Sequence, residues 1–285
     1  MLKIKLISGE ALKDALSLLL PEIDAELCSC PNCTNPDLAV TVKETEEDVL
    51  RVTLDGKEAT LTYGGGKARA FRGFAKLIAW KKAGKTEASA EEHPLFETNG
   101  AMADVSRCNV LKLDTVKYMM RKMALMGMNQ YMLYAEDIFE VEGYPYFGHL
   151  RGRYTIAQIK ELDAYALALG IELVPCIQLL GHLGAMLKWN ATAPYKDTTY
   201  ALLVGADATY ALIGKILDTV KESFTTKSHN LVANCYPLLN KLRNDCNYTK
   251  SKSLFVGSFF SFLVNNGVGA ANLKADRQVA LNVTL

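Results

Sequence analysis

Side chains suited to binding a sugar follow three stretches of the chain that have the character of strands. The first stretch ends in Asp104-Val-Ser-Arg107, the second in Tyr134-Ala-Glu136-Asp137, and the third in Gln178-Leu-Leu-Gly-His182. Carboxylates and a guanidinium group can each make paired hydrogen bonds to neighbouring hydroxyls, and an indole can stack on the apolar face of a pyranose. The candidate substrate-binding residues are therefore Asp104, Arg107, Glu136, Asp137, His182 and Trp189.

A purely structural role for these side chains is the alternative. Arg107 and Asp104 are close enough in the chain to form an ion pair, and His182 could be a satisfied turn residue. However, the carboxyl ends of parallel strands meet at one edge of a sheet, so these groups would converge on one rim. This convergence favours a binding site over the structural interpretation.

Three β/α units are predicted to position these residues. Strands are expected at Gly100 to Ser106, Asn129 to Tyr134 and Ile171 to Ile177. Helices are expected between and after them, at Lys112 to Met126, from Ile156 and from Asp207. Strands and helices that alternate with short links predict a parallel sheet with helical crossovers.

The ends of these helices carry recognisable signals. Thr155 and Gln158 have the spacing of a capping box, and Asp207 is a candidate N-cap. Gly127 and Gly170 stand where helices are expected to end. The pattern does not distinguish a doubly wound sheet from the beginning of a (β/α)₈ barrel, and a whole barrel typically needs about 250 residues.

The first 95 residues predict a separate small α+β domain. Asp55-Gly56 between two alternating segments is a strong hairpin signal. The expected strands are Leu2 to Ile7, Leu38 to Val42, Val49 to Leu54 and Ala59 to Tyr63, and the expected helices are Glu10 to Leu20 and Lys67 to Lys82. We therefore predict three parts: the small domain at 1–95, a β/α domain at 96–227, and a divergent, irregular or disordered tail at 228–285.

Two short motifs invite a ligand-binding interpretation and are weak. Cys28, Cys30 and Cys33 could bind zinc, but a structural zinc site needs four ligands, so an incidental cysteine-rich loop is favoured and no metal site is predicted. Gly64-Gly65-Gly66-Lys67 lacks the first glycine and the Ser or Thr of a phosphate-binding loop. A flexible turn from strand to helix is the better interpretation.

The composition excludes several classes of protein. Apolar residues make up 49% of the 285 residues, enough for a folded core, and the formal net charge is +1. A general nucleic-acid or anionic-membrane binder would show a basic excess. The longest apolar run, Ser253 to Val264, is too short to cross a bilayer, and no convincing signal peptide opens the chain. Together with seven cysteines, most of them scattered, these features lead us to expect a cytoplasmic protein.

Several motifs of the middle part resemble those of glycoside hydrolase family 20, in particular its intracellular bacterial exo-β-N-acetylglucosaminidases. They occur in the family's order over about Phe96 to Lys227. The matching segments are Asn99 to Arg107, Met123 to Asn129, Leu133 to Asp137, Glu142 to Gly148, Arg151 to Tyr154 and Gly170 to Gln178, followed by Gly181-His182.

The resemblance implies a β-N-acetylhexosaminidase with a (β/α)₈ barrel, of which this chain has the first three units. Such an enzyme removes terminal β-linked N-acetylglucosamine or N-acetylgalactosamine by substrate-assisted, retaining catalysis, without a cofactor. The substrate's acetamido oxygen attacks C1, a Glu protonates the leaving oxygen, and an adjacent Asp orients the acetamido group. By the same resemblance, Arg107 would bind sugar hydroxyls and His182 would support the catalytic carboxylates.

The chain departs from the family pattern near Lys227. The family's catalytic Asp-Glu pair would end the fourth strand, yet no Asp-Glu dipeptide follows Lys227, and residues 228–285 contain no Glu. A frameshift, a truncated gene or a misassembled frame would produce this change. No catalytic residue is identifiable, and we expect little or no activity. The alternatives are a non-catalytic sugar-binding remnant and, less favoured, a zinc-binding interaction module.

Overall fold

The computed structural model describes residues 1–28, 35–107, 109–226, 230–232, 254–257 and 261–264. The chain divides into two compact units, which are described separately. The first comprises Met1–Ala101, Leu113–Tyr131 and Ala164–Glu172; the second comprises Met102–Lys112, Met132–Asp163 and Leu173–Leu285. Both units combine helices with sheets that contain parallel strands, so the fold is mixed α/β, as expected.

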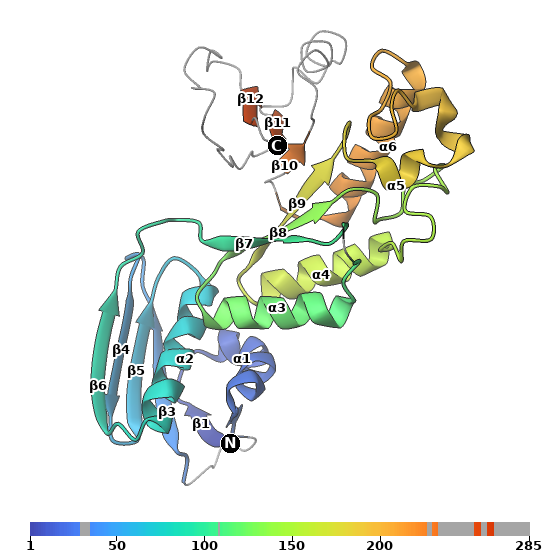
Figure 1. The fold of residues 1–285 in the computed structure, drawn as a ribbon. Helices are drawn as coiled ribbons and strands as arrows, with labels where there is room; N and C mark the ends of the chain where they lie inside the picture. The colour runs from blue at the N-terminus through green and yellow to red at the C-terminus, as the bar shows by residue number, and fades with distance from the viewer. Residues whose placement is uncertain (29–34, 108, 227–229, 233–253, 258–260, 265–285) are drawn as a thin grey trace. The chain divides into compact units, whose positions relative to one another are not determined.

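The first unit contains a six-stranded sheet in the order β2-β1-β3-β5-β4-β6. Strands β1, β2, β3 and β5 pair in parallel, whereas β4 pairs antiparallel with both β5 and β6. Helices α1 and α2 lie on the same face of this sheet (Figure 1). The strands are β1 (Leu2–Leu6), β2 (Ala25–Leu27), β3 (Leu38–Glu44), β4 (Leu50–Asp55), β5 (Glu58–Tyr63) and β6 (Glu87–Glu92); the helices are η1 (Glu10–Leu12), α1 (Lys13–Leu19), η2 (Leu20–Ile23), α2 (Lys67–Lys82) and α3 (Leu113–Leu125).

Alternation along the strands explains how this sheet packs. Leu50, Val52 and Leu54 are buried, while the residues between them are half-buried or exposed. Strand residues alternate between the two faces, so the buried set forms the face that the helices cover. In α2, Gly73 permits close packing on the sheet, because a Cβ atom there would lie 2.5 Å from Leu61 Cδ1.

Most predicted elements of the first unit are confirmed. The Asp55-Gly56 turn joins β4 and β5 as a hairpin, with Gly56 at φ 59°. Gly65 and Gly66 lie in the turn between β5 and α2, where a turn from strand to helix was predicted. Two strands, β2 and β6, were not predicted. The β6 sequence, Glu-Ala-Ser-Ala-Glu-Glu, lacks the branched and aromatic residues that signal a strand, and its pairing with β4 establishes it as one.

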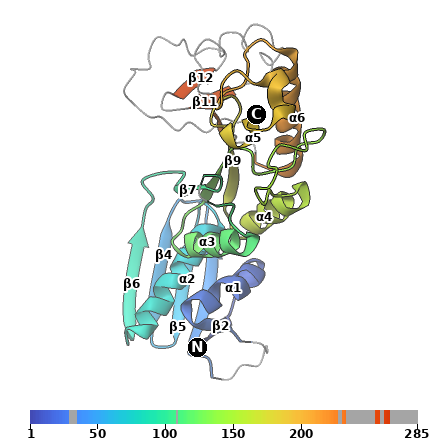
Figure 2. The same cartoon turned by 45° about the vertical axis from the view of Figure 1, so that its right-hand side comes forward.

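The strands that carry the candidate binding residues end in the second unit, and their sheet has the order β12-β11-β10-β9-β8-β7. Strands β7 and β8 are parallel, since hydrogen bonds join Gln130 N to Asn99 O near their beginnings and Val105 N to Tyr134 O near their ends. The segment η3 contacts both α5 and α6 (Figure 2). The strands are β7 (Gly100–Asp104), β8 (Gln130–Ala135) and β9 (Glu172–Gln178); the helices are α4 (Ile156–Ala168), α5 (Gly184–Leu187), η3 (Asn190–Tyr195) and α6 (Asp207–Ser223).

The helix-end signals have different outcomes. The capping box before α4 is confirmed: Thr155 N donates to Gln158 Oε1 (2.9 Å), and Gln158 N donates to Thr155 Oγ1 (3.1 Å). Gly127 and Gly170, both at positive φ, follow α3 and α4. The prediction that Asp207 is an N-cap is wrong, because Ala206 occupies the cap and Asp207 is the first residue of α6. At that position its carboxylate still lies at the positive end of the helix dipole.

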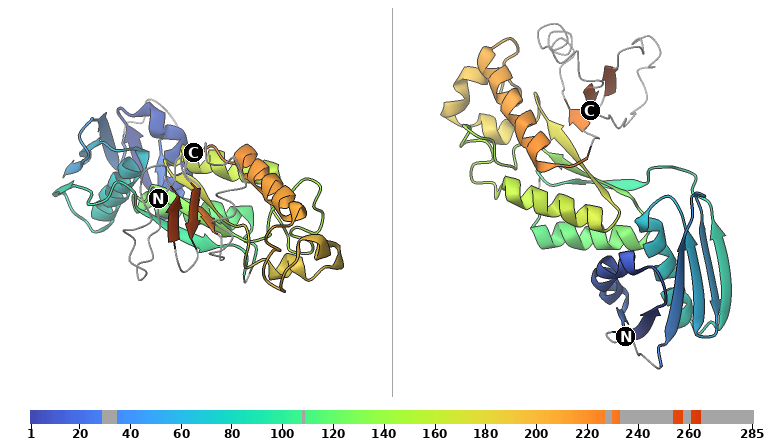
Figure 3. Two further views of the ribbon diagram at one scale, coloured as in Figure 1. Left: turned by 90° about the horizontal axis from the view of Figure 1, so that it is seen from above. Right: turned by 180° about the vertical axis from the view of Figure 1, so that it is seen from behind.

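The prediction of an irregular tail is wrong for three short segments after residue 227. β10 (Asn230–Val232) pairs parallel with β9, β11 (Leu254–Gly257) pairs parallel with β10, and β12 (Ser261–Val264) pairs antiparallel with β11 (Figure 3). Main-chain hydrogen bonds to an exposed strand do not require a recognisable side-chain pattern, so pairing rather than composition identifies these strands. The other residues of the tail lie outside the described part of the chain.

No helix among the described residues is long and apolar enough to span a membrane.

Candidate functional site

The candidate site lies at the carboxyl ends of β7, β8 and β9, and all of its residues belong to the second unit. Its centre is the hydroxyl of Tyr134. This hydroxyl accepts hydrogen bonds from Arg107 Nη2 (2.9 Å) and Gln178 Nε2 (2.7 Å), and it lies 3.3 Å from Glu136 Oε1, to which it can donate. The phenol therefore connects one side chain from the end of each of the three strands.

Arg107 is held on more than one side. Its guanidinium carbon lies 4.8 Å from the centre of the Tyr134 ring, and its Nε lies 3.3 Å from Glu136 Oε1. Its side chain is nevertheless 53% exposed. A planar, permanently charged donor group that is positioned yet accessible is well suited to bind pairs of hydroxyls.

Glu136 is the buried acid of this network. Its side chain is 10% exposed, and its backbone N–H donates to Ser106 Oγ at 2.8 Å. Burial raises the pKa of Glu136, although Arg107 and Tyr134 act in the opposite direction. Burial also raises the pKa of Tyr134, to about 12, so the phenol stays neutral and keeps its proton.

Asp104 shapes the turn after β7. Its Oδ1 accepts hydrogen bonds from the backbone N–H groups of Ser106 (2.9 Å) and Arg107 (3.1 Å). Its Oδ2 lies 3.5 Å from Arg107 Nε, so the ion pair considered as the structural alternative does form. The pair does not isolate Arg107, which also contacts Tyr134 and Glu136.

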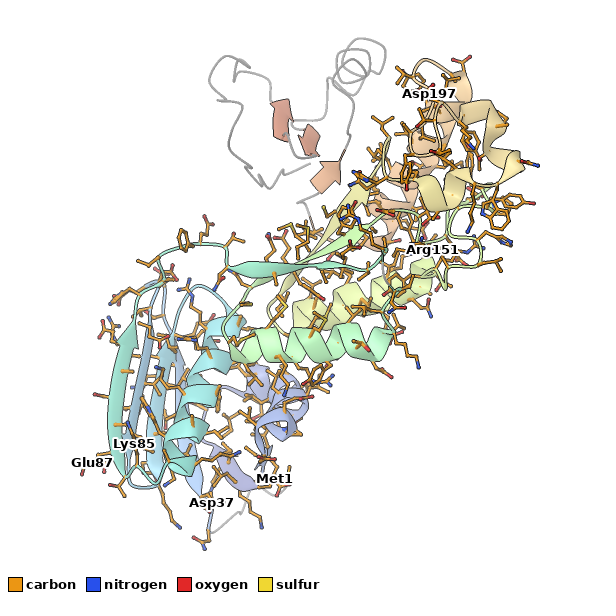
Figure 4. All side chains as sticks on the ribbon, in the orientation of Figure 1. Met1, Asp37, Lys85, Glu87, Arg151 and Asp197 are labelled. Atoms are coloured by element: carbon orange, nitrogen blue, oxygen red, sulfur yellow. The ribbon has the colours of Figure 1, made fainter. Side chains whose placement is uncertain are left out.

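Asp137 forms a second, deeper pair with Arg151. The Asp137 side chain is 1% exposed, and its Oδ1 lies 3.6 Å from Arg151 Nε. Burial raises its pKa, and Arg151 opposes that rise. Arg151, labelled in Figure 4 on the segment between β8 and α4, also donates to the backbone carbonyl of Ser106. Arg151 thus links the loop after β8 to the loop after β7.

The other two predicted residues follow β9 and stand apart from the Tyr134 network. His182 is half-buried at φ 58°, and no described residue forms a hydrogen bond or ion pair with it. Trp189 is half-buried, and its ring lies 5.0 Å from that of His149 and 5.8 Å from that of Tyr146. The structure therefore joins Asp104, Arg107 and Glu136 directly, and Asp137 through Arg151.

The sequence analysis missed four contributors: Tyr134, Gln178, Ser106 and Arg151. Two of them carried a usable signal. Tyr134 precedes Glu136 by two residues in a strand, so both side chains lie on the same face. Gln178 is the last residue of β9 and is buried. The contacts of Arg151 depend on the folding of a loop and gave no comparable signal.

No group of three or more potential ligands among the described residues is arranged to hold a metal ion. Cys28 is half-buried and follows β2, whereas Cys30 and Cys33 lie outside the described residues. The candidate zinc motif is therefore not tested as a set.

Polar groups at the carboxyl ends of parallel strands define the class of β/α proteins whose ligands bind at that edge. In agreement, residues 96–233 match the family model for the glycosyl hydrolase family 20 catalytic domain. The matched segment is the part of the chain whose motifs resemble that family. No curated protein sequence is significantly similar to the chain.

Solved structures of β-N-acetylhexosaminidases share the fold. The enzyme from Bacteroides fragilis is 18% identical with a TM-score of 0.64, and the match covers 86% of this chain and 56% of the other. The Streptomyces coelicolor enzyme is 19% identical with a TM-score of 0.64, covering 81% and 55%. A mutant Streptomyces plicatus β-hexosaminidase in complex with product (GlcNAc) is 19% identical with a TM-score of 0.63, covering 81% and 54%. The chain thus spans little more than half the length of these proteins.

Proposed function

We propose that this chain is the sugar-binding part of a glycoside hydrolase that removes terminal β-linked N-acetylhexosamine. The observation that carries the proposal is the network around Tyr134, in which an exposed Arg107 is fixed beside the buried Glu136 at the carboxyl end of the sheet. The family 20 match over residues 96–233 supports the choice of sugar.

In this proposal Arg107 binds hydroxyls of the terminal sugar. Glu136 and Tyr134 hold the guanidinium plane, and Asp104 fixes the turn that carries it. Asp137 and Arg151 hold the neighbouring loop in place. His182 and Trp189 are proposed to line the same sugar from the loop after β9.

The reaction itself needs two further groups. A general acid must protonate the leaving oxygen, and a carboxylate must orient the acetamido group that attacks C1. No Asp-Glu pair is present after Lys227 to supply them. General acid catalysis is typically worth about 10²- to 10⁴-fold, so we expect this chain to bind sugar without efficient turnover.

We propose the domain division at 95 and 227 on the same basis. Residues 96–227 would provide the first three β/α units of a barrel, and 1–95 the small domain that precedes it. The cytoplasmic location stays a prediction from the sequence.

Calorimetric titration of the 285-residue chain with N-acetylglucosamine tests the proposal. We expect saturable binding that Arg107→Ala weakens at least about tenfold, because hydrogen bonds to charged groups are typically worth ~1.5–3 kcal/mol. Arg51→Ala, which removes a comparably charged side chain from β4 in the first unit, is the control and should leave binding unchanged.

Hydrolysis of an aryl β-N-acetylglucosaminide completes the test. Binding without release of the aryl group supports a sugar-binding part that lacks the catalytic pair. Efficient release would show that the catalytic groups are present after all. If the chain neither binds the sugar nor releases the aryl group, the proposal of a sugar site in this chain is refuted.

A further inference from the structure

A cavity of about 270 Å³ lies within the first unit, and none of its lining residues belongs to the candidate sugar site. Its walls come mainly from the beginning of α2, the segment that follows β6, and the turns that follow α3 and α4. Pockets that bind small molecules typically measure about 300–1,000 Å³. The volume lies just below that range, so the cavity suits a ligand no larger than about one sugar ring.

Two glycines bring backbone close to α2 and so define the walls of the cavity. A Cβ atom at Gly127 would lie 2.8 Å from Cδ of Arg72, and one at Gly170 would lie 2.9 Å from the backbone nitrogen of Ala68. A larger residue at either position would push its turn away from α2. The walls are thus formed by closely packed backbone rather than by mobile side chains.

Arg72 provides hydrogen-bond donors on the wall that α2 forms. Its Nε and Nη2 donate to the two carboxylate oxygens of Glu92, at 2.5 and 3.2 Å, and its Nη1 donates to the backbone carbonyl of Met126 at 3.2 Å. A guanidinium group has five N–H donors, so these contacts leave others available. The Arg72 side chain is 44% exposed, which makes the remaining donors accessible to a ligand.

The charges around the cavity balance one another. Besides the Arg72–Glu92 pair, Arg69 forms an ion pair with Asp48. The two arginines therefore already have carboxylate partners, and Glu97 adds a negative charge to the lining. A phosphate or carboxylate ligand would have to compete with these carboxylates, and an ammonium ligand would meet the arginines. The lining thus favours a neutral ligand that carries several hydrogen-bonding groups.

The segment that follows β6 contributes an aromatic ring and an available amide. Asn129 holds this segment: its Oδ1 accepts a hydrogen bond from Asn99 N, and its Nδ2 donates to Glu97 O, both at 2.8 Å. Phe96 lines the cavity and is 73% exposed. The Asn99 side chain, which also lines the cavity, forms no hydrogen bond with any described residue. The segment thus offers a flat apolar surface together with a free donor and acceptor.

We infer that this cavity is a second sugar-binding site, which takes a neutral pyranose separately from the Arg107 site. A pyranose has C–H groups that can pack on the Phe96 ring and hydroxyls that can bond to Arg72 and Asn99. A hydrocarbon of the same size would leave these polar groups without partners. The inference goes beyond the proposed function, because it requires neither Arg107 nor a reaction.

NMR titrations of the ¹⁵N-labelled 285-residue chain with N-acetylglucosamine and, separately, with glucose test this inference. Gly66 and Gly127 line the cavity, so their backbone amide signals report on it. The amide signals of Ser106 and Arg107 report on the site at the carboxyl end of the sheet. We expect saturable shifts of the cavity signals with at least one of the two sugars, and Arg107→Ala should leave these shifts unchanged.

Phe96→Ala and Asn99→Ala test the two kinds of contact, and because both side chains are exposed, neither change should disturb the fold. Each should weaken binding in the cavity roughly two- to tenfold, as expected for the loss of one stacking contact or one neutral hydrogen bond. Tyr118→Ala is the matched control, since Tyr118 is also an exposed aromatic residue of the first unit (47%) but does not line the cavity. This variant should bind as the parent does.

The outcomes separate the second site from the proposed function. Shifts confined to Ser106 and Arg107 with both sugars would overturn the second site while the proposed function stands. Shifts confined to the cavity signals would support the second site and count against the proposed function, and no shift at either site would overturn both. A cavity affinity that neither Phe96→Ala nor Asn99→Ala reduces would also overturn the second site. So would cavity shifts that appear with inorganic phosphate and with neither sugar.

Discussion

The hydroxyl of Tyr134 offers the sharpest test of the candidate site. Tyr134→Phe removes one oxygen atom and leaves the ring under the Arg107 guanidinium. The lost atom accepts from Arg107 and Gln178 and contacts Glu136, at 2.9, 2.7 and 3.3 Å respectively. A buried donor that loses its partner typically costs ~1–3 kcal/mol. Gln178 is 2% exposed, and its Oε1 already lacks a hydrogen bond within the described chain, so its amide cannot turn to water for compensation.

We therefore expect Tyr134→Phe to lower the free energy of unfolding by about 2–3 kcal/mol, dominated by Gln178 and supplemented by Arg107. The affinity for N-acetylglucosamine should also fall about tenfold or more, because Arg107 loses one of the contacts that orient it. Urea denaturation measures the first quantity and calorimetric titration the second.

Tyr131→Phe is the matched control. Tyr131 lies on the same strand and is fully buried, but among the described residues its hydroxyl contacts only the sulfur of Met119, at 3.2 Å. The control should lose less stability and no sugar affinity. If the two variants behaved alike in both assays, the network around Tyr134 would not be what organises the site.

Three further predictions concern packing and charge. Gly148→Ala should destabilise the chain by more than Gly143→Ala. Both glycines have positive φ, but only at Gly148 would a Cβ atom meet the backbone, 2.4 Å from Asp137 O. Equal melting temperatures of the two variants would refute this. Asp137→Asn should be more stable than the parent at neutral pH. Burial raises the Asp137 pKa above its ordinary 3.8, so the ionised form costs stability as the pH rises through the folded pKa, and the advantage should vanish on acidification. Glu22→Gln should lose ~1–3 kcal/mol at neutral pH. Burial raises the Glu22 pKa, but ion pairs with Arg121 and Lys122 outweigh burial and hold the pKa below 4.5. The loss of stability in Glu22→Gln should therefore shrink as the pH falls through the folded pKa. A difference in the free energy of unfolding that does not change with pH, measured by urea denaturation, would contradict this prediction.

Local patterns predicted the fold best where a period or a turn residue was strong. The helix over Lys67–Lys82 matches its predicted bounds, and the hairpin at Asp55-Gly56 formed as expected. Strand β6 was missed because its identity comes from pairing with β4 rather than from its own composition. The Asp207 cap was misplaced by one residue, since both a cap and a first-turn position favour an acidic side chain.

From the sequence, the candidate site could be located only to the ends of particular strands. This was enough to predict that Asp104, Arg107 and Glu136 lie close together, because parallel strands end at one edge of the sheet. It could not reveal that a phenol joins them, or that Arg151 reaches from a loop to the carbonyl of Ser106. Such contacts depend on side-chain conformations and loop paths that spacing along the chain does not encode.

Under the proposed function, His182 trades stability for a role in binding within a single residue. Its φ of 58° is a conformation that glycine adopts freely and that a side chain with a Cβ atom adopts at a cost of about 1 kcal/mol. A sequence optimised only for thermal resistance would place glycine there. Retaining an imidazole gives up part of that resistance for a planar ring with two nitrogens that can form hydrogen bonds. Engineering for higher thermal stability should therefore leave His182 unchanged, even though a non-glycine residue at positive φ is the kind of position that such engineering would first replace with glycine.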